Sequence, residues 1–321
     1  MDNSAPENSK TEGTLKRILI YTGITFALTY AYGFGLLPVL SAKATSGGQL
    51  IAVLYQLAYT GIMFFPAIGA LLTRLITREG FRNHYLAPHL KGNVRAYLLA
   101  WFAPFVCTIL GALVWFLVRP DSFDPKMGFL TAQLNGQELP IPGGTLLLIQ
   151  TVEALLLAPV LNAVPSFGEE WGWRGYLVPK LDELCKPLLT VLISGVIWGL
   201  WHAPVIALGH NYGLDYPSAP LGGILMMCVF TTFAGVLMAY VTIRTKSCLP
   251  AIFAHGMLNG IASLGAFFTA DGGNPFLGPL PTGIVGMSGF IALAVILLIL
   301  WRKRDGKLPE TGAEQGEPLA K

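Results

Sequence analysis

Long apolar stretches separated by short polar ones dominate this chain. A helix needs about 20 apolar residues to cross a hydrocarbon core of roughly 30 Å, and eight stretches approach or exceed that length. We predict membrane-spanning helices over residues 17–40, 50–76, 94–118, 144–166, 187–208, 220–243, 248–270 and 281–301. The pattern therefore predicts an all-α, polytopic membrane helix bundle of about eight transmembrane helices around a polar intramembrane cavity.

The polar ends of the chain frame a single predicted domain. Residues 15–304 form this transmembrane domain, and residues 1–14 and 305–321 are predicted to be disordered tails. The first apolar stretch is too long for the apolar region of a signal peptide, so we expect it to be retained as a span. We find no internal repeat of the kind that marks transporters built from two related halves.

Composition supports a membrane protein. Charged residues make up 12% of the chain and hydrophobic residues 53%, with a mean hydropathy of +0.58. A soluble domain carries roughly 25% charged residues. The lipid bilayer is therefore a predicted partner.

Lysine and arginine are distributed unevenly between the predicted loops. With eight spans and the N-terminus in the cytoplasm, all but three of the 21 basic residues fall on the cytoplasmic side; the exceptions are Lys43, Arg119 and Lys126. Cytoplasmic loops are enriched in these residues, so both termini are predicted to be cytoplasmic, in the plasma membrane of a prokaryote. The net charge of +3 is spread along that face, and we predict no nucleic-acid partner.

Two adjacent glutamates and an arginine lie inside an apolar segment, where ionisable groups are costly and are read as functional by default. Glu170 and Arg174 are four residues apart, so on a helix they share a face and can pair. Glu169 is rotated by about 100° from Glu170 and stays free of that pair. Its neighbours Trp171 and Trp173 disfavour the charged carboxylate, which suits a general base. Glu169 is therefore the candidate base, and Glu170 the orienting or charge-balancing residue.

Two histidines and an asparagine add polar groups to other apolar segments. His255 and Asn259 are also four residues apart and project from one helix face. A neutral imidazole can bind water, and an asparagine amide can donate to a developing oxyanion. His202 lies just before Pro204, which removes a backbone N–H from the helix. A divalent metal such as zinc is left open as a cofactor; its ligands would be Glu169, His202 and His255, although no HExxH motif is present.

Three motifs follow one another on separate apolar segments. They read Glu169-Glu170-Trp-Gly-Trp-Arg174, Trp198-Gly-Leu-Trp-His202 and His255-Gly-Met-Leu-Asn259. Together they resemble the CPBP family of CAAX proteases and bacteriocin-processing enzymes, also called Abi-type intramembrane proteases, and in particular its type II CAAX prenyl endopeptidases. The resemblance covers roughly residues 144–262. The family usually has Phe where this chain has Trp198, which alters the expected pocket wall.

The resemblance implies a peptidase in which a glutamate and histidines activate water for attack on a peptide bond. Glu169, His202, His255 and Asn259 would be essential, with Glu170 and Arg174 in support. The implied substrate is a peptide or lipidated protein, cut after a prenylated cysteine in the CAAX-type case, with dependence on glutamate or metal left open. Two alternatives are a non-catalytic binding or immunity factor of the same fold and an ion-coupled transporter.

Helix lengths predict where these groups lie. At about 1.5 Å per residue, His202 would be about 22 Å deep if its span began at residue 187, too deep to meet His255, so we expect that span to begin near residue 192. Residues 144–181 are expected to form a long kinked or two-piece helix that carries Glu169 back into the membrane. We predict a wet chamber that opens toward the cytoplasm. Glu153 is expected to be structural, and His210 to lie solvated in an outer loop.

Overall fold

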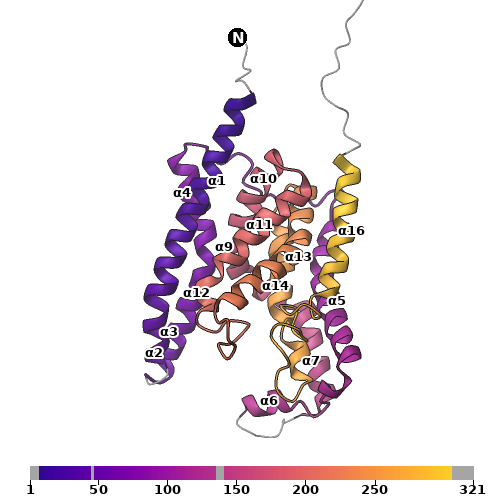
Figure 1. The fold of residues 1–321 in the computed structure, drawn as a ribbon. Helices are drawn as coiled ribbons and strands as arrows, with labels where there is room; N and C mark the ends of the chain where they lie inside the picture. The colour runs from indigo at the N-terminus through magenta and orange to yellow at the C-terminus, as the bar shows by residue number, and fades with distance from the viewer. Residues whose placement is uncertain (1–6, 45–46, 135–140, 306–321) are drawn as a thin grey trace, which may run out of the picture.

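The computed structural model describes residues 7–44, 47–134 and 141–305. All regular elements of these residues are helices, apart from one isolated bridge between Asn274 and Gly278. Figure 1 shows the helices side by side in one bundle, most of them running between its two ends. The prediction of an all-α membrane helix bundle is confirmed.

Five helical stretches are long and apolar enough to cross a membrane: Thr11–Ala44, Gly48–Ile76, Val94–Val118, Leu221–Thr245 and Leu249–Phe267. Three shorter apolar helices occupy the other predicted spans: Gly143–Leu156, Pro187–Trp201 and Ser288–Arg302. Every predicted stretch thus contains a helix. The count of eight crossings is not confirmed, because the three shorter helices fall below the length that a full crossing needs.

The N-terminal part of the bundle consists of α1 (Glu7–Tyr30), η1 (Ala31–Leu36), α2 (Leu37–Ala44), α3 (Gly48–Gly61), η2 (Ile62–Phe64), α4 (Phe65–Ile76), α5 (Val94–Val118), η3 (Pro120–Ser122) and α6 (Gly128–Gln133). Helix α1 begins at Glu7, inside the stretch predicted as an N-terminal tail; the division into one domain between two tails stays a prediction. Residues 1–6 and 306–321, the remainder of the two predicted tails, lie outside the described residues.

The segment that carries the paired glutamates is a broken helix. It consists of α7 (Gly143–Leu156), α8 (Ala158–Leu161), α9 (Ala163–Gly172), the π-helical turn η4 (Trp173–Leu177) and α10 (Val178–Leu184). Pro159 lies in the first turn of α8, where a proline is tolerated because no partner for its N–H is needed. The kinked helix predicted over residues 144–181 is therefore present.

The C-terminal part contains α11 (Pro187–Trp201), α12 (Ala203–Ile206), α13 (Leu221–Thr245), α14 (Leu249–Ile261), α15 (Leu264–Phe267) and α16 (Ser288–Asp305). Helix α11 begins at Pro187, so the start expected near residue 192 is wrong. His202 thus lies at the far end of a complete helix, deeper than the sequence argument allowed.

Glycines bring the broken segment close to α4. A Cβ at Gly168 would lie 2.6 Å from the carbonyl oxygen of Met63, and one at Gly172 would collide with the backbone of Pro66. In lipid there is no hydrophobic driving force between helices, so helices are held together largely by close packing, which small residues of this kind allow. The contact fixes the rotation of α9 and therefore the directions of the two glutamates that follow Gly168.

The bundle has two chemically different ends. The start of α1 and the end of α16 lie at the same end, at the top of Figure 1. We call this the basic end, and it includes the connections at residues 77–93 and 245–248. We call the opposite end the loop end, defined by residues 207–220 and 268–287. The elements and connections at this end contain, in the described chain, Lys16, Arg17, Arg74, Arg78, Arg82, Lys91, Arg95, Lys180, Lys186, Arg244, Lys246 and Arg302.

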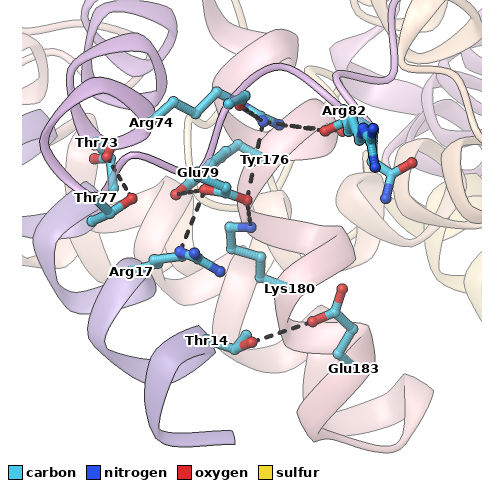
Figure 2. A network of polar contacts seen from close by, with 12 residues as sticks. Thr14, Arg17, Thr73, Arg74, Thr77, Glu79, Arg82, Tyr176, Lys180 and Glu183 are labelled. Atoms are coloured by element: carbon cyan, nitrogen blue, oxygen red, sulfur yellow. Dashed lines mark hydrogen bonds and ion pairs between the residues drawn. The ribbon is translucent and has the colours of Figure 1, made fainter. Parts of the chain in front are cut away.

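A polar network at the basic end ties α1, α4 and α10 together (Figure 2). Glu79 accepts a hydrogen bond of 2.8 Å from the Tyr176 hydroxyl and pairs with Lys180 and, at 3.7 Å, with Arg17. The guanidinium of Arg74 lies 4.0 Å from the same carboxylate and donates to the carbonyl of Gly80 at 2.9 Å. One carboxylate thus joins three separate segments.

We predict that Glu79→Gln lowers the free energy of unfolding by about 1–3 kcal/mol at neutral pH, because the cations around it lose their partner. Burial raises the pKa of Glu79, but the hydrogen bond and ion pair from Lys180 outweigh burial and hold the pKa below the ordinary value of 4.5. The stabilisation is therefore complete above that ordinary value and is lost as the pH falls through the lowered value in the folded protein. Thermal unfolding in detergent across an acid series would measure it.

Asp121→Asn is the matched control, because Asp121 pairs with Arg119 on the exposed surface. Such exposed pairs contribute little, so this variant should unfold like the wild type. An advantage of the wild type over Glu79→Gln that grows on acidification would contradict the assignment.

Candidate active site

Glu170 lies at the centre of a buried ion network. Its side chain is fully buried, and its Oε1 accepts hydrogen bonds from Arg174 Nη1 at 2.9 Å and from His255 Nδ1 at 2.8 Å. The predicted pairing of Glu170 with Arg174 is confirmed. The bond from His255 was not predicted; it joins α9 to α14 across the bundle and directs the other imidazole nitrogen, Nε2, away from Glu170.

Glu169 points to the other side of the same turn. Its carboxylate is 2% exposed, its Oε2 accepts a hydrogen bond of 2.7 Å from the indole Nε1 of Trp198, and its Oε1 lies 4.0 Å from His255 Nε2. As predicted, it makes no ion pair with Arg174, the helix partner of Glu170. The tryptophan beside it is Trp198 and not the expected Trp171 or Trp173, since the Trp171 indole donates to the carbonyl of His84.

Trp198 contacts four polar groups of the site. Besides its bond to Glu169, its ring lies under the guanidinium of Arg174 at 4.0 Å and against the His255 ring at 5.5 Å. Its backbone carbonyl accepts a hydrogen bond of 2.8 Å from His202 Nδ1. From the sequence alone, Trp198 was expected only to shape the pocket wall. An indole N–H that a phenylalanine lacks was the signal that could have shown more.

His202 lies one helical turn beyond Trp198, toward the loop end. Because its Nδ1 donates to a carbonyl, its Nε2 is the nitrogen left for other partners. Its ring lies nearly parallel to the ring of His210, with centroids 6.3 Å apart and planes 4° apart. His210 is half-buried, so the expectation that it is solvated is wrong: the chain after α12 folds back and brings it beside His202.

A cavity of about 360 Å³ joins these groups. It is lined by Glu169, His202, His255 and Asn259 together with Trp198 and His210. Asn259 is an exposed part of the lining. Glu170 and Arg174 lie behind this lining, and Glu153 lies exposed on α7, apart from the cavity.

The predicted metal ligands do not come together as a metal site. The described residues hold no group of three or more histidine, cysteine, aspartate or glutamate side chains able to bind an ion. Glu169 Oε2 is occupied by the indole N–H, while the bonded Nδ1 atoms leave each histidine its Nε2, the nitrogen that a metal would need. Only Glu169 Oε1 and His255 Nε2 converge, so Glu169, His202 and His255 do not fit the expected coordination.

Two acceptor atoms instead face one gap at the inner end of the cavity. With Nδ1 of His255 donating to the Glu170 carboxylate, Nε2 of a neutral His255 carries a lone pair. Glu169 Oε1, 4.0 Å away, is also an acceptor. Two acceptors at this spacing can take both hydrogens of one water molecule and leave its oxygen lone pairs directed at the cavity.

The lining also determines which end the cavity faces. Gln56, Asn211 and Ser263 are exposed members of the lining, and the buried Thr282 joins them from the loop after α15. Among the lining residues there is no member of 77–93 or 245–248. The cavity therefore extends toward the loop end, whereas with the predicted topology the cytoplasm adjoins the basic end. The side of the membrane on which the cavity opens stays a prediction.

Comparison with known proteins identifies relatives of the central region. Residues 151–261 match the family model described as Rce1-like, type II CAAX prenyl endopeptidase Rce1-like. CAAX prenyl protease 2 of Methanococcus maripaludis is 26% identical over 92 residues, which cover 28% of this chain and 34% of that protein. The uncharacterized protein YyaK of Bacillus subtilis is 26% identical over 270 residues, 81% of this chain and 77% of that protein. The resemblance read from the three motifs is confirmed, and the matches support a CAAX-type intramembrane peptidase.

The ion network makes a stability prediction. Glu170→Ala leaves the buried Arg174 without its partner, which should cost about 3–5 kcal/mol, because an uncompensated buried charge is far worse than a missing pair. The double variant Glu170→Ala/Arg174→Leu removes the charge as well and should recover a large part of the loss. Thermal unfolding of the purified variants in detergent would measure both. A double variant no more stable than Glu170→Ala would contradict this account.

Proposed function

Because residues 151–261 are similar to the Rce1-like type II CAAX prenyl endopeptidases, we propose that this chain is an intramembrane endopeptidase that hydrolyses a peptide bond with a glutamate-activated water. The observation that carries the proposal is the convergence of Glu169 Oε1 and His255 Nε2 at 4.0 Å on the inner end of a cavity.

In the proposed reaction, water donates one hydrogen bond to Glu169 and the other to His255. Glu169 takes a proton as the water oxygen forms a bond to the substrate carbonyl carbon. The carbonyl oxygen gains negative charge, and the Asn259 side-chain amide donates a hydrogen bond to it. The C–N bond then breaks, and the leaving amine takes the proton from Glu169, which restores the carboxylate.

The remaining residues of the site position the reacting groups and the substrate. Glu170 and Arg174 hold His255 in the tautomer that leaves Nε2 free, and Trp198 fixes the direction of the Glu169 carboxylate. His202 Nε2 accepts a hydrogen bond from the substrate backbone. The chain's similarity to a CAAX prenyl protease favours a lipidated protein substrate, and we propose that cleavage depends on the prenyl group and on Glu169.

We predict that Glu169→Gln lowers turnover by about 100-fold or more, because the amide still accepts the indole hydrogen bond but cannot take a proton. The assay uses a fluorogenic peptide with a prenylated cysteine beside the same peptide without the prenyl group, in detergent or proteoliposomes. Glu153→Gln is the matched control, since Glu153 is exposed and remote from the cavity. Equal turnover by the wild type and Glu169→Gln would refute the assignment of the base and favour a non-catalytic role.

We predict that Trp198→Phe lowers kcat by about 10- to 100-fold with little change in KM, since it keeps the ring but removes the donor that orients Glu169. Trp173→Phe is the matched control: Trp173 is also buried, but its indole N–H has no hydrogen-bond partner. Steady-state kinetics on variants of equal unfolding temperature separates the two. Equal losses in both variants would show that the effect is packing alone.

A further inference from the structure

We propose that a second cavity, at the basic end of the bundle, binds the phosphate group of an anionic membrane phospholipid. This cavity has a volume of about 340 Å³ and is lined by Asn83, His84, Tyr85, Ala87, His89 and Lys246. None of these residues lines the cavity that holds Glu169. The proposal therefore concerns a separate site and does not depend on the proposed peptidase function.

The cavity lies where two connections between helices meet. Residues 77–93 join α4 to α5, and the connection at residues 245–248 joins α13 to α14. Nδ1 of His89 donates to the carbonyl of Thr245 at 3.1 Å. The backbone N–H of Cys248 donates to the carbonyl of Tyr85 at 2.7 Å. These hydrogen bonds hold the two connections against each other, so the cavity is a built feature of the fold.

The backbone around this cavity has an unusual conformation. Four of the six lining residues have a positive φ: 56° at Asn83, 58° at Tyr85, 41° at His89 and 52° at Lys246. This left-handed region favours glycine, and residues with a side chain adopt it only where the surroundings fix them there. Such residues cluster at ligand-binding sites. The conformation therefore favours a role for these side chains beyond joining two helices.

The carbonyl groups of residues 77–93 are paired with donors of the bundle. Arg74 donates to the carbonyl of Gly80 at 2.9 Å and to that of Asn83 at 3.2 Å, and Figure 2 shows Arg74 reaching this connection from α4. The Trp171 indole donates to the carbonyl of His84 at 3.0 Å. Because these acceptors are already bonded to the bundle, the chemistry of the cavity is set by the side chains that line it.

The lining side chains are mainly donors, as an anion requires. Lys246 supplies a positive charge with three N–H donors, and Asn83 supplies an amide. Nδ1 of His84 accepts a hydrogen bond of 3.0 Å from the Leu86 N–H, so the hydrogen of a neutral ring lies on Nε2, which can donate. Charge-assisted hydrogen bonds to phosphate oxygens are among the strong ones. A metal cation, by contrast, would be repelled by Lys246.

The charge around the cavity is mostly positive. Among the described lining residues none is acidic, and Arg82, Lys91 and Arg244 lie within two residues of the lining along the chain. Burial, and to a smaller extent the negative charge of Glu183, raises the pKa of the Tyr85 hydroxyl, which therefore stays protonated and can donate. Basic pockets beside membrane helices are typical sites for anionic lipid headgroups.

Exposed apolar side chains beside the cavity favour a lipid over a free phosphate ion. Phe81 and Leu90 flank the lining residues of the connection, and both are exposed. Ile76 at the end of α4 and Val94 at the start of α5 are exposed as well. A phospholipid would place its acyl chains against these side chains while its phosphate enters the cavity.

Thermal unfolding with added lipid tests the site without using activity. The purified protein in a non-ionic detergent is titrated with phosphatidylglycerol, with phosphatidylcholine, whose choline cancels the phosphate charge, and with inorganic phosphate. Phosphatidylglycerol is expected to raise the unfolding temperature most, because a ligand that binds the folded state stabilises it. No shift with phosphatidylglycerol would overturn the proposal, and an equal shift with inorganic phosphate would overturn the lipid as the source of the phosphate.

Variants of one lysine locate the binding. Lys246→Gln should need about fivefold more phosphatidylglycerol for half of the full shift, since one cationic contact is lost, whereas Lys246→Arg keeps the charge and should respond like the wild type. Lys186→Gln is the matched control, because Lys186 is an exposed lysine of the basic end that does not line the cavity. Lipid-free unfolding temperatures show that each variant is folded. Equal lipid dependence in the wild type and Lys246→Gln, or an equal loss in Lys186→Gln, would overturn the assignment.

Discussion

Burial of the Glu170 carboxylate is the constraint on which the rest of the site depends. An ionised carboxylate inside a helix bundle is stable only when cations and hydrogen-bond donors surround it. Arg174 supplies the cation from the same helical segment, and His255 supplies a donor from α14. The same bond that compensates the charge also fixes the imidazole tautomer, so structural stability and the direction of His255 Nε2 have one cause.

The adjacent glutamate can take a different role because helix geometry separates neighbours in sequence. Glu169 and Glu170 point about 100° apart, one toward the cavity and one into the ion network. Gly168 and Gly172 set this rotation, since a side chain would collide with η2 at the first and with α4 at the second. The π-helical turn that starts at Trp173 lies directly after them, and such turns are frequent at functional sites. Local backbone geometry thus explains why two identical side chains have different surroundings.

Sequence reasoning succeeded where the answer is local. Apolar length gave the positions of the helices, and the spacing of Glu170 and Arg174 gave their pairing, because both depend only on distances along one helix. It failed where the answer depends on how helices lie against each other. The depth of His202 was predicted from residue counts alone, which required a helix start near residue 192. The helix in fact begins at Pro187. Trp198 lies one helical turn before His202, and it is Trp198 that contacts both Glu169 and His255.

The role of Trp198 and the place of His210 were missed for the same reason. A tryptophan in an apolar helix is normally predicted to be a packing residue. Its hydrogen bond to a carboxylate on another segment becomes visible only in the folded structure. A histidine in a loop is normally predicted to be solvated. Here the loop folds back over the bundle and places His210 beside His202. The end toward which the cavity faces is likewise a property of the whole assembly.

An asymmetric bundle also explains how buried charges and water can coexist in one membrane protein. The Glu79 network and the packed η4 turn keep water away from Glu170 and Arg174, where a low dielectric strengthens their attraction. A few ångströms toward the loop end, the lining changes to amides, imidazoles and a hydroxyl, which hold water well. Glu169 lies at this boundary. On the closed side its carboxylate is held in a fixed orientation away from water, and on the other side it faces the cavity. A general base needs both conditions, and the position of Glu169 between a closed end and an open one supplies them.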